Sequence, residues 1–240
     1  MNDMQKLVIL IFLPVVLLIL ILDHLLPGAA IVRYIKLAIL IVLFCLTLLF
    51  KKTLRSDYIE KKLIRLAFFL VVLSDFLFVA GLHISPLHDE TTLIGVIGFF
   101  TSYICLILAF RKAPLTGIGQ VIAAMPVLAV YIPFLIWFSP WVSGSLFYGT
   151  LLFSLVLCGM TWRAICTITE RYYTVHVAHG LALAGYLMFI SDLAVGLAVF
   201  NPIFTDKFDP WLQNIIWSSF ICAWIIIVLV LAEKDFLNPY

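Results

Sequence analysis

The chain has 240 residues, of which 65% are hydrophobic and 12% are charged, and its formal net charge is +2. Soluble domains are about half apolar and about a quarter charged. A mean hydropathy of +1.19 therefore excludes a soluble globular protein and predicts a polytopic membrane protein surrounded by membrane lipids. The small net charge and the lack of a basic block give no indication of a nucleic-acid partner.

Eight apolar stretches are long enough to cross a bilayer, for which about 20 residues are needed. In chain order they cover residues 7–22, 29–50, 63–82, 93–110, 115–138, 144–162, 173–199 and 212–232. Continuous apolar runs favour helices over the short alternating segments of a β-barrel. We therefore predict an all-α fold, a single membrane domain over residues 1–240 built as a bundle of about eight transmembrane helices.

The basic residues of the links predict the orientation of the chain, because cytoplasmic loops are enriched in Lys and Arg. The link after the second stretch and the links after the fourth and sixth hold ten of them: Lys51, Lys52, Arg55, Lys61, Lys62, Arg65, Arg111, Lys112, Arg163 and Arg171. The loops 83–92 and 200–211 hold one, Lys207. We expect both termini in the cytoplasm, loops 83–92 and 200–211 outside, and a location in the plasma or inner membrane.

Three ionisable residues lie inside the stretches and are candidates for a functional site, since a charge in the bilayer is costly. Lys36 in the second stretch, Asp75 in the third and Asp192 in the seventh each lie about seven residues from the outer end. At 1.5 Å per residue, all three are about 10 Å below the outer boundary. This shared depth predicts one polar site, in which Ser74 and Ser191 hydrogen-bond near the carboxylates. The alternatives are a structural ion pair and, for Lys36, a side chain that reaches the membrane surface.

His176 and His179 are three residues apart and face one side of the seventh helix, a spacing that suits a metal. They lie near the cytoplasmic end, far from Asp192, and a third ligand is not identified, so we predict no metal site. The five cysteines form no CxxC pair, and we interpret them as small apolar packing residues: Cys45, Cys105, Cys158, Cys166 and Cys222.

The seventh stretch carries the most specific motif, GYLMFISDLAVGLAVF. It resembles a signature of the YhhN family of membrane proteins, which includes the lysoplasmalogenases. The signature is a glycine, a phenylalanine, Ser-Asp and a final phenylalanine, matched by Gly185, Phe189, Ser191, Asp192 and Phe200.

Other elements extend the resemblance over residues 30–232. Asp75 in LVVLSDFLFV is similar to the acidic residue that ends a leucine-rich helix of the family. Lys36 matches the Lys of a K-P-L element, with Leu37 in place of Pro, and Met160 and Ala164 fit the sixth helix.

The chain departs from the family pattern at two polar positions. The fourth helix of the family has a His three residues before a Tyr, where this chain has Tyr103 and Leu106. The Tyr and Gln of the last helix are replaced by Phe220 and Trp224.

The resemblance implies hydrolysis of the vinyl ether bond of a lysoplasmalogen, a lysophospholipid, to a fatty aldehyde and glycerophospho-ethanolamine or -choline. This chemistry needs a proton donor, an anion that stabilises the resulting cation, and a water, and it implies no cofactor. Two carboxylates in one apolar pocket tend to be one neutral and one ionised, which suits the first two tasks. We expect Asp192 and Asp75 to be catalytic, with Asp192 as the acid. The residues expected to bind substrate are Lys36, which suits the phosphate, Ser74, Ser191 and Tyr103.

Other function classes remain open. The chain can be another lipid hydrolase or a lipid-binding relative without this activity. A transporter would also need buried charges, but inverted repeats are typical of that class, and the two Ser-Asp helices run in the same direction. A metal-dependent amide hydrolase like the alkaline ceramidases would need three histidines and a carboxylate at one depth, and the histidines here are scattered.

Overall fold

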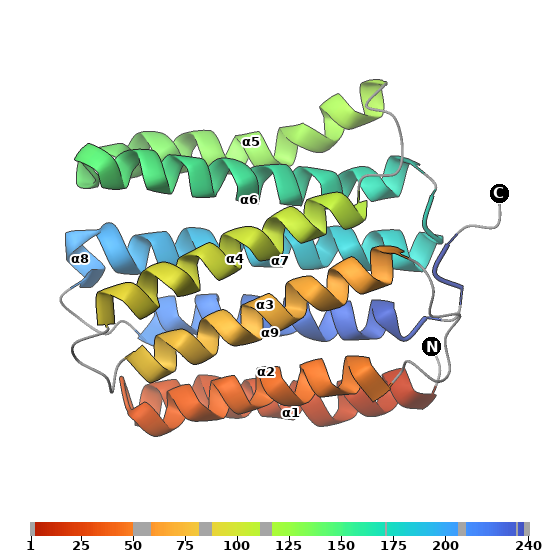
Figure 1. The fold of residues 1–240 in the computed structure, drawn as a ribbon, viewed down its shortest axis with the longest axis horizontal. Helices are drawn as coiled ribbons and strands as arrows, with labels where there is room; N and C mark the ends of the chain where they lie inside the picture. The colour runs from red at the N-terminus through yellow and green to blue at the C-terminus, as the bar shows by residue number, and fades with distance from the viewer. Residues whose placement is uncertain are drawn as a thin grey trace.

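The computed structural model of the chain describes residues 3–49, 59–81, 88–110, 117–170, 172–205, 210–233 and 235–237. Over these ranges the chain is a bundle of long helices without a strand, apart from an isolated bridge between Tyr173 and Leu237 (Figure 1). The elements are α1 (Asp3–Leu25), α2 (Ala30–Leu49), α3 (Ile59–Gly81), α4 (His88–Phe110), α5 (Ile118–Phe138), the 3-10 turn η3 (Ser139–Trp141), α6 (Gly144–Glu170), α7 (Val175–Phe200), α8 (Pro202–Thr205) and α9 (Pro210–Leu231). The prediction of an all-α bundle is confirmed.

Seven of these helices are long and apolar enough to cross a membrane, namely α1, α2, α4, α5, α6, α7 and α9. The remaining long helix, α3, carries Arg65 and Asp75 and has a similar length of 23 residues. It lies in the same bundle, packed against α2 and α4 (Figure 1). The chain is therefore an integral membrane protein.

The helices differ most from the predicted spans in α6, which continues to Glu170 instead of ending at 162. The prediction that Arg163 lies in a loop is wrong, because its side chain is buried within α6. Lys61, Lys62 and Arg65 were also expected in a link, but they lie in α3, which begins at Ile59. The other residues that carry the orientation prediction and lie outside the described residues are Lys51, Lys52, Arg55, His83, Arg111, Lys112, Arg171 and Lys207. The orientation stays a prediction.

The long helices alternate in direction, so the start of α1 and the end of α9 lie at the same end of the bundle, here called the terminal end (Figure 1). Gln5 joins them there, since its Nε2 donates to the carbonyl oxygen of Leu229 (3.2 Å) and to Oε1 of Glu233 (2.7 Å). The opposite end, which holds the α1–α2 turn and α8, is called the far end. Helix α9 packs against α1, α2 and α7, whereas α5 lies at the edge against α6.

Two glycines allow the helices around the centre to approach closely, as small residues do in membrane proteins. A Cβ at Gly185 of α7 would lie 2.6 Å from Cβ of Ala164 in α6. A Cβ at Gly98 of α4 would collide with Oγ of Ser74 in α3. Both glycines therefore set the spacing of the helices that carry Asp75 and Asp192.

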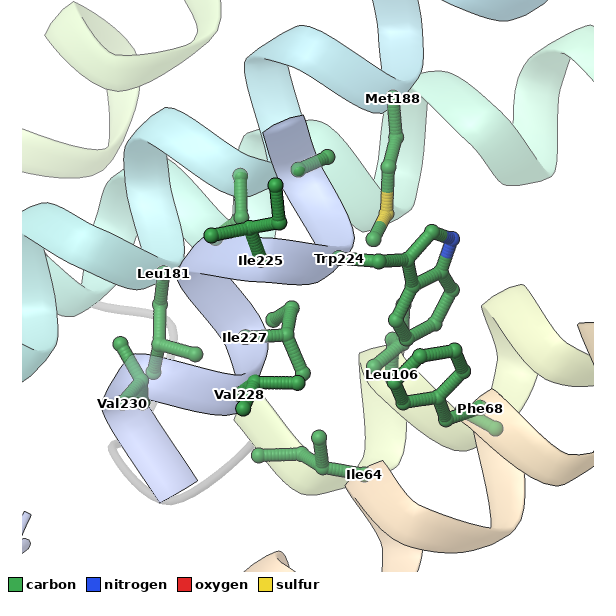
Figure 2. Close-up of a cluster of buried hydrophobic side chains, with 14 of the residues drawn as sticks. Ile64, Phe68, Leu106, Leu181, Met188, Trp224, Ile225, Ile227, Val228 and Val230 are labelled. Carbon is green, nitrogen blue, oxygen red and sulfur yellow. The ribbon is translucent and has the colours of Figure 1, made fainter. Parts of the chain in front are cut away.

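The apolar core centres on Trp224 of α9, whose side chain is fully buried. Figure 2 shows its ring between Met188 of α7 and Phe68 of α3, with Leu106 of α4 beside them. The rings of Trp224 and Phe68 are stacked with centroids 4.2 Å apart. This cluster joins four helices in the half of the bundle nearer the terminal end, and the predicted polar site lies farther from that end.

Candidate functional site

A tyrosine from α4 and an aspartate from α7 meet inside the bundle. The hydroxyl of Tyr103 donates a hydrogen bond to Oδ2 of Asp192. Tyr103 is fully buried, and its ring is held by Phe99 (centroids 6.5 Å apart) and by Phe153 of α6 (5.8 Å). The aromatic packing therefore fixes the hydroxyl that orients the carboxylate.

Asp75 of α3 is the third member of this group. Its carboxylate is near enough to interact electrostatically with both Asp192 and Tyr103. Its Oδ2 is enclosed and has no hydrogen-bond partner. The structure thus brings the two predicted catalytic residues and Tyr103 into one group, here called the acidic site. In this group Asp192 accepts a hydrogen bond, whereas Oδ2 of Asp75 is buried without one.

Lys36, which was expected to share this site, has other partners. Its Nζ lies 2.8 Å from Oδ1 of Asp23 in α1, with both side chains only 3% exposed. Nζ also lies 4.5 Å from the ring centroid of Trp217 in α9. The ion pair was not predicted, because Asp23 comes one residue after the predicted first span.

Residues of α9 connect the Lys36 pair to the acidic site. The ring of Trp217 contacts Phe220 (centroids 5.9 Å apart), and Phe220 contacts Phe99 beside Tyr103 (6.0 Å). Ser191, next to Asp192, donates to the carbonyl oxygen of Ile216 (3.0 Å), the residue before Trp217. Three rings in contact, those of Trp217, Phe220 and Phe99, therefore connect Lys36 to Tyr103 of the acidic site.

Ser74 and Ser191 use their hydroxyl protons on the backbone. Ser74 donates to the carbonyl oxygen of Leu70, one turn earlier in α3 (2.7 Å), and Ser191 joins α7 to α9 as described above. Both side chains are buried in helix contacts. Their oxygens can still accept a hydrogen bond, so substrate binding by these two serines stays a prediction.

The residues that depart from the family pattern have apolar surroundings. Phe220 packs on Phe99 and on Trp224 (6.4 Å), and Leu106 belongs to the cluster of Figure 2. Trp224 has no hydrogen-bond partner for its buried Nε1. Phe220 and Leu106 carry no polar group, and the hydrogen bond that Asp192 accepts comes from Tyr103.

The structure gives no support for a metal among the residues it describes, where no group of three or more His, Cys, Asp or Glu side chains can hold an ion. His176 and His179 are exposed on the first turns of α7. Nδ1 of His179 is hydrogen-bonded to the carbonyl oxygen of Val175 (2.8 Å).

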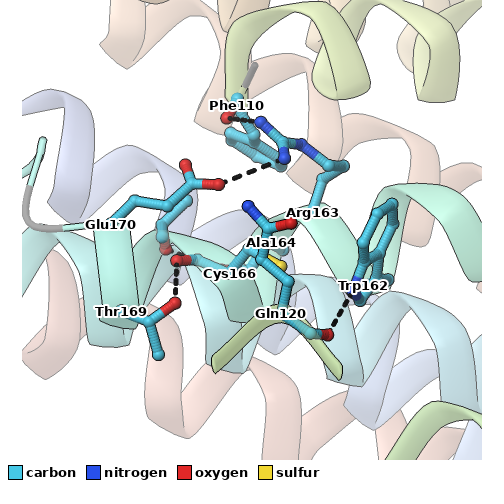
Figure 3. Close-up of polar contacts among 9 residues, drawn as sticks. Phe110, Gln120, Trp162, Arg163, Ala164, Cys166, Thr169 and Glu170 are labelled. Atoms are coloured by element: carbon cyan, nitrogen blue, oxygen red, sulfur yellow. Dashed lines mark hydrogen bonds and ion pairs between the residues drawn. The ribbon is translucent and has the colours of Figure 1, made fainter. Parts of the chain in front are cut away.

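Another buried carboxylate, that of Glu170, lies near the terminal end and was not predicted. Oε1 of Glu170 accepts a hydrogen bond from Nη1 of Arg163 (3.1 Å), and Nη2 of Arg163 donates to the carbonyl oxygen of Phe110 (3.1 Å; Figure 3). The two side chains are 4% and 5% exposed. This pair fastens the end of α6 to the end of α4, and the spacing of the two residues, seven apart on one helix face, was the available signal.

Comparison with known proteins gives one match. The model of the YhhN family matches residues 30–231, which include Lys36, Asp75, Tyr103 and Asp192. No curated protein and no solved structure matches the chain significantly.

Proposed function

The chain belongs to the YhhN family, and from that premise we propose that it is a membrane hydrolase that cleaves the vinyl ether bond of lysoplasmalogens. The observation that carries the proposal is the acidic site, where Asp75 and Asp192 lie together inside a bundle of membrane helices. A bond that belongs to a lipid is best reached by acidic groups that are themselves within the membrane.

The reaction begins with transfer of a carboxylic-acid proton to the outer vinyl carbon. The C=C π electrons form the new C–H bond, and the ether oxygen shares the positive charge with its neighbouring carbon. Water adds to that carbon and loses a proton to the remaining carboxylate, which gives a hemiacetal. The bond between the hemiacetal carbon and the glycerol oxygen then breaks, and the hydroxyl proton moves to the glycerol oxygen. The products are the fatty aldehyde and glycerophospho-ethanolamine or -choline, and one water is consumed overall.

The hydrogen bonding supports a division of work between the two carboxylates. A hydrogen bond donated by Tyr103 stabilises the ionised form of Asp192, so Asp192 is suited to stabilise the cation and to accept the proton from water. Asp75, whose Oδ2 has no donor, is suited to carry the proton that is transferred. This assignment reverses the roles expected from the sequence, where Tyr103 was not known to contact Asp192.

The location follows as part of the proposal. We place the terminal end in the cytoplasm of a cell with the protein in its plasma or inner membrane, and the acidic site in the outer half of the bilayer. Asp57 and Asp206, which lie outside the described residues, provide the test. Cysteines placed there in a Cys-free background should be labelled from the cytoplasm and from outside, respectively, and the reverse pattern would contradict this orientation.

Aldehyde release by purified, reconstituted protein tests the activity. We expect a fatty aldehyde from 1-alkenyl lysophosphatidylethanolamine, and none from the matching 1-alkyl lipid, because a saturated ether has no carbon to protonate. In D₂O, one deuterium should be found on the carbon next to the aldehyde when the product is trapped at once as the alcohol. This label is specific to carbon protonation.

Other outcomes would point to the other function classes. Release of fatty acid from a 1-acyl lysophospholipid, without aldehyde from the alkenyl lipid, would indicate a different lipid hydrolase. Movement of intact lipid between leaflets without any cleavage would indicate a transporter. Either result would overturn the proposal.

A further inference from the structure

Trp224 of α9 borders the acidic site on the side of the terminal end. Its ring packs with Met188 of α7, which comes one turn before Asp192, and with Leu106 of α4, which comes three residues after Tyr103 (Figure 2). At 1.5 Å per residue, Tyr103 and Asp192 are about 4.5–6 Å farther along the bundle than the residues that pack with the ring. The indole is therefore the layer of side chains next to the acidic site, and the proposed hydrolysis has so far given it no role.

The directions of the helices bring the indole and the carboxylates toward each other. A helical side chain leans toward the N-terminus of its own helix. Helices α3 and α7 begin at the terminal end, so Asp75 and Asp192 lean toward the level of Trp224 (Figure 1). Helix α9 begins at the far end, so Trp224 leans toward the acidic site. Figure 2 agrees with this, since Nε1 lies on the edge of the ring that is on the side of Met188 and away from Ile227.

Nε1 of Trp224 is a buried donor without a hydrogen-bond partner among the described residues, and its side chain is fully buried. Buried N–H groups in native proteins are nearly always hydrogen-bonded. Met188 beside the ring offers a thioether sulfur, which is a weak acceptor. The indole of Trp162 shows the usual situation, since its Nε1 donates to the carbonyl oxygen of Gln120 (2.9 Å; Figure 3). The N–H of Trp224 thus needs an oxygen acceptor, and it faces the acidic site.

We propose that Nε1 of Trp224 holds the water that adds to the substrate in the proposed hydrolysis. The N–H donates to one lone pair of the water oxygen, and the water donates one of its protons to the carboxylate of Asp192. The second lone pair forms the bond to the cationic carbon, and the donated proton passes to Asp192 as that bond forms. Trp224 is thus a positioning residue that acts through the water. The inference rests on the proposed function and names the residue that orients its second reactant.

Deuterium exchange into unreacted substrate separates the addition of water from the transfer of the proton to carbon. When water addition is slow, the cation returns a proton from its outer carbon to the acid, and the C=C bond forms again. In D₂O the recovered alkenyl lipid then carries deuterium on its outer vinyl carbon. The experiment measures the rate of this exchange and the rate of aldehyde release by mass spectrometry, with the reconstituted full chain and 1-alkenyl lysophosphatidylethanolamine.

Trp224→Phe removes the indole N–H and keeps an aromatic ring beside Phe68. The loss of one hydrogen bond between neutral groups typically corresponds to a factor of about 2–10. We therefore expect the ratio of exchange to aldehyde release to rise by about that factor. Altered packing alone would slow both reactions together and leave the ratio unchanged, so the ratio distinguishes a positioning role from a structural one.

Two further variants separate the N–H from the shape of the ring. Incorporation of 3-benzothienylalanine at position 224 keeps the size of the indole and replaces its N–H by sulfur, and it should raise the ratio as Trp224→Phe does. Trp162→Phe removes an indole N–H whose acceptor is the backbone of α5, and it should keep the ratio of the wild type.

Nuclear magnetic resonance tests the water contact without turnover. In the wild-type chain with ¹⁵N-labelled tryptophan, the indole N–H signal that is absent from the position-224 variants should show a nuclear Overhauser effect with water. This measurement needs no rate from a variant whose folding is impaired.

An unchanged ratio in both position-224 variants, or a Trp224 indole N–H without contact to water, would overturn the inference. Aldehyde release by the wild type together with an unchanged ratio in the variants contradicts the inference alone. A wild type that gives neither aldehyde nor exchange contradicts the proposed hydrolysis, and the inference with it.

Discussion

The Arg163–Glu170 pair and the acidic site differ in how the charge of their carboxylates is balanced. Near the terminal end, Glu170 faces the guanidinium of Arg163, which also donates to the carbonyl oxygen of Phe110 (Figure 3). In the acidic site, Asp75 faces Asp192, and the hydrogen bond that the structure shows there comes from the neutral hydroxyl of Tyr103.

The difference shows how burial alone fails to distinguish a structural carboxylate from a reactive one. A carboxylate paired with Arg can remain ionised and fasten two helices together. Two carboxylates that share an apolar site cannot both be ionised at low cost, so such a site can retain a transferable proton. We therefore expect substitutions in the acidic site to change activity and substitutions in the Arg163 pair to change stability.

Replacing either carboxylate of the acidic site should have the largest effect. Asp75→Asn removes the transferred proton and Asp192→Asn removes the anion, while both keep the side-chain shape. General acid–base catalysis typically contributes about 10²–10⁴-fold, so initial rates of aldehyde release should fall by at least about that factor. Thermal unfolding should change little, because a neutral amide replaces a buried ionisable group. If wild type releases no aldehyde and both variants unfold at lower temperature, the two Asp residues are structural.

Breaking the Arg163 pair should instead reduce stability. Glu170→Gln leaves a buried guanidinium without its carboxylate, and removal of one partner of a buried pair typically costs about 3–5 kcal/mol. The free energy of unfolding from denaturant titration measures the loss. The double variant Arg163→Met/Glu170→Leu should recover most of it, and activity per folded molecule should be unchanged. A single-variant loss below about 1 kcal/mol, or a large fall in activity per folded molecule, would contradict the structural assignment.

Removing the hydroxyl of Tyr103 should have an intermediate effect on activity. Tyr103→Phe keeps the ring contacts with Phe99 and Phe153 but loses a hydrogen bond to a charged group, worth about 1.5–3 kcal/mol. At about 1.4 kcal/mol per factor of ten, aldehyde release should fall about 10–100-fold. Phe99→Leu is the control for altered packing and should have less effect on the rate. A Phe variant with the wild-type rate would show that Tyr103 does not support Asp192.

Filling the close contact between α6 and α7 should have the smallest effect. Gly185→Ala brings two Cβ atoms to 2.6 Å unless the helices separate, and overpacking of this kind typically costs about 1–3 kcal/mol. Because Gly185 lies between the acidic site and the Arg163 pair, this variant tests whether the packing of α6 on α7 holds both groups in position. Gly149→Ala on α6, where an added Cβ meets nothing within 4 Å, is the matched control. Equal unfolding temperatures for both variants would argue against a tight contact at Gly185.

The fold and the proximity of Asp75 and Asp192 could be predicted from the sequence, for a simple physical reason. Long apolar runs have few ways to satisfy their backbone in lipid, so the bundle follows from hydropathy. Asp75 and Asp192 stood out because a carboxylate within such a run has no local partner to explain it. Depth along the helix then placed them at one level, and the structure brings them together.

The missed partners share a different cause. Asp23 and Glu170 lie beyond the predicted ends of their spans, where hydropathy predicts a loop for a charged residue. Their pairing with Lys36 and Arg163 depends on how helices rotate and on how far α6 continues, and hydropathy contains neither. For the same reason the contact between Tyr103 and Asp192 was not foreseen, since it joins residues 89 positions apart.

The packing of α9 has a consequence for how the chain is assembled during synthesis. Its apolar window is 61% buried, more than that of any other candidate span among the described residues, and it packs against α1, α2 and α7. The ribosome makes α9 after all three of these partners have been made. Until α9 is made, α1, α2 and α7 lack these contacts, and Lys36 gains its contact with Trp217 only when the last helix is in place.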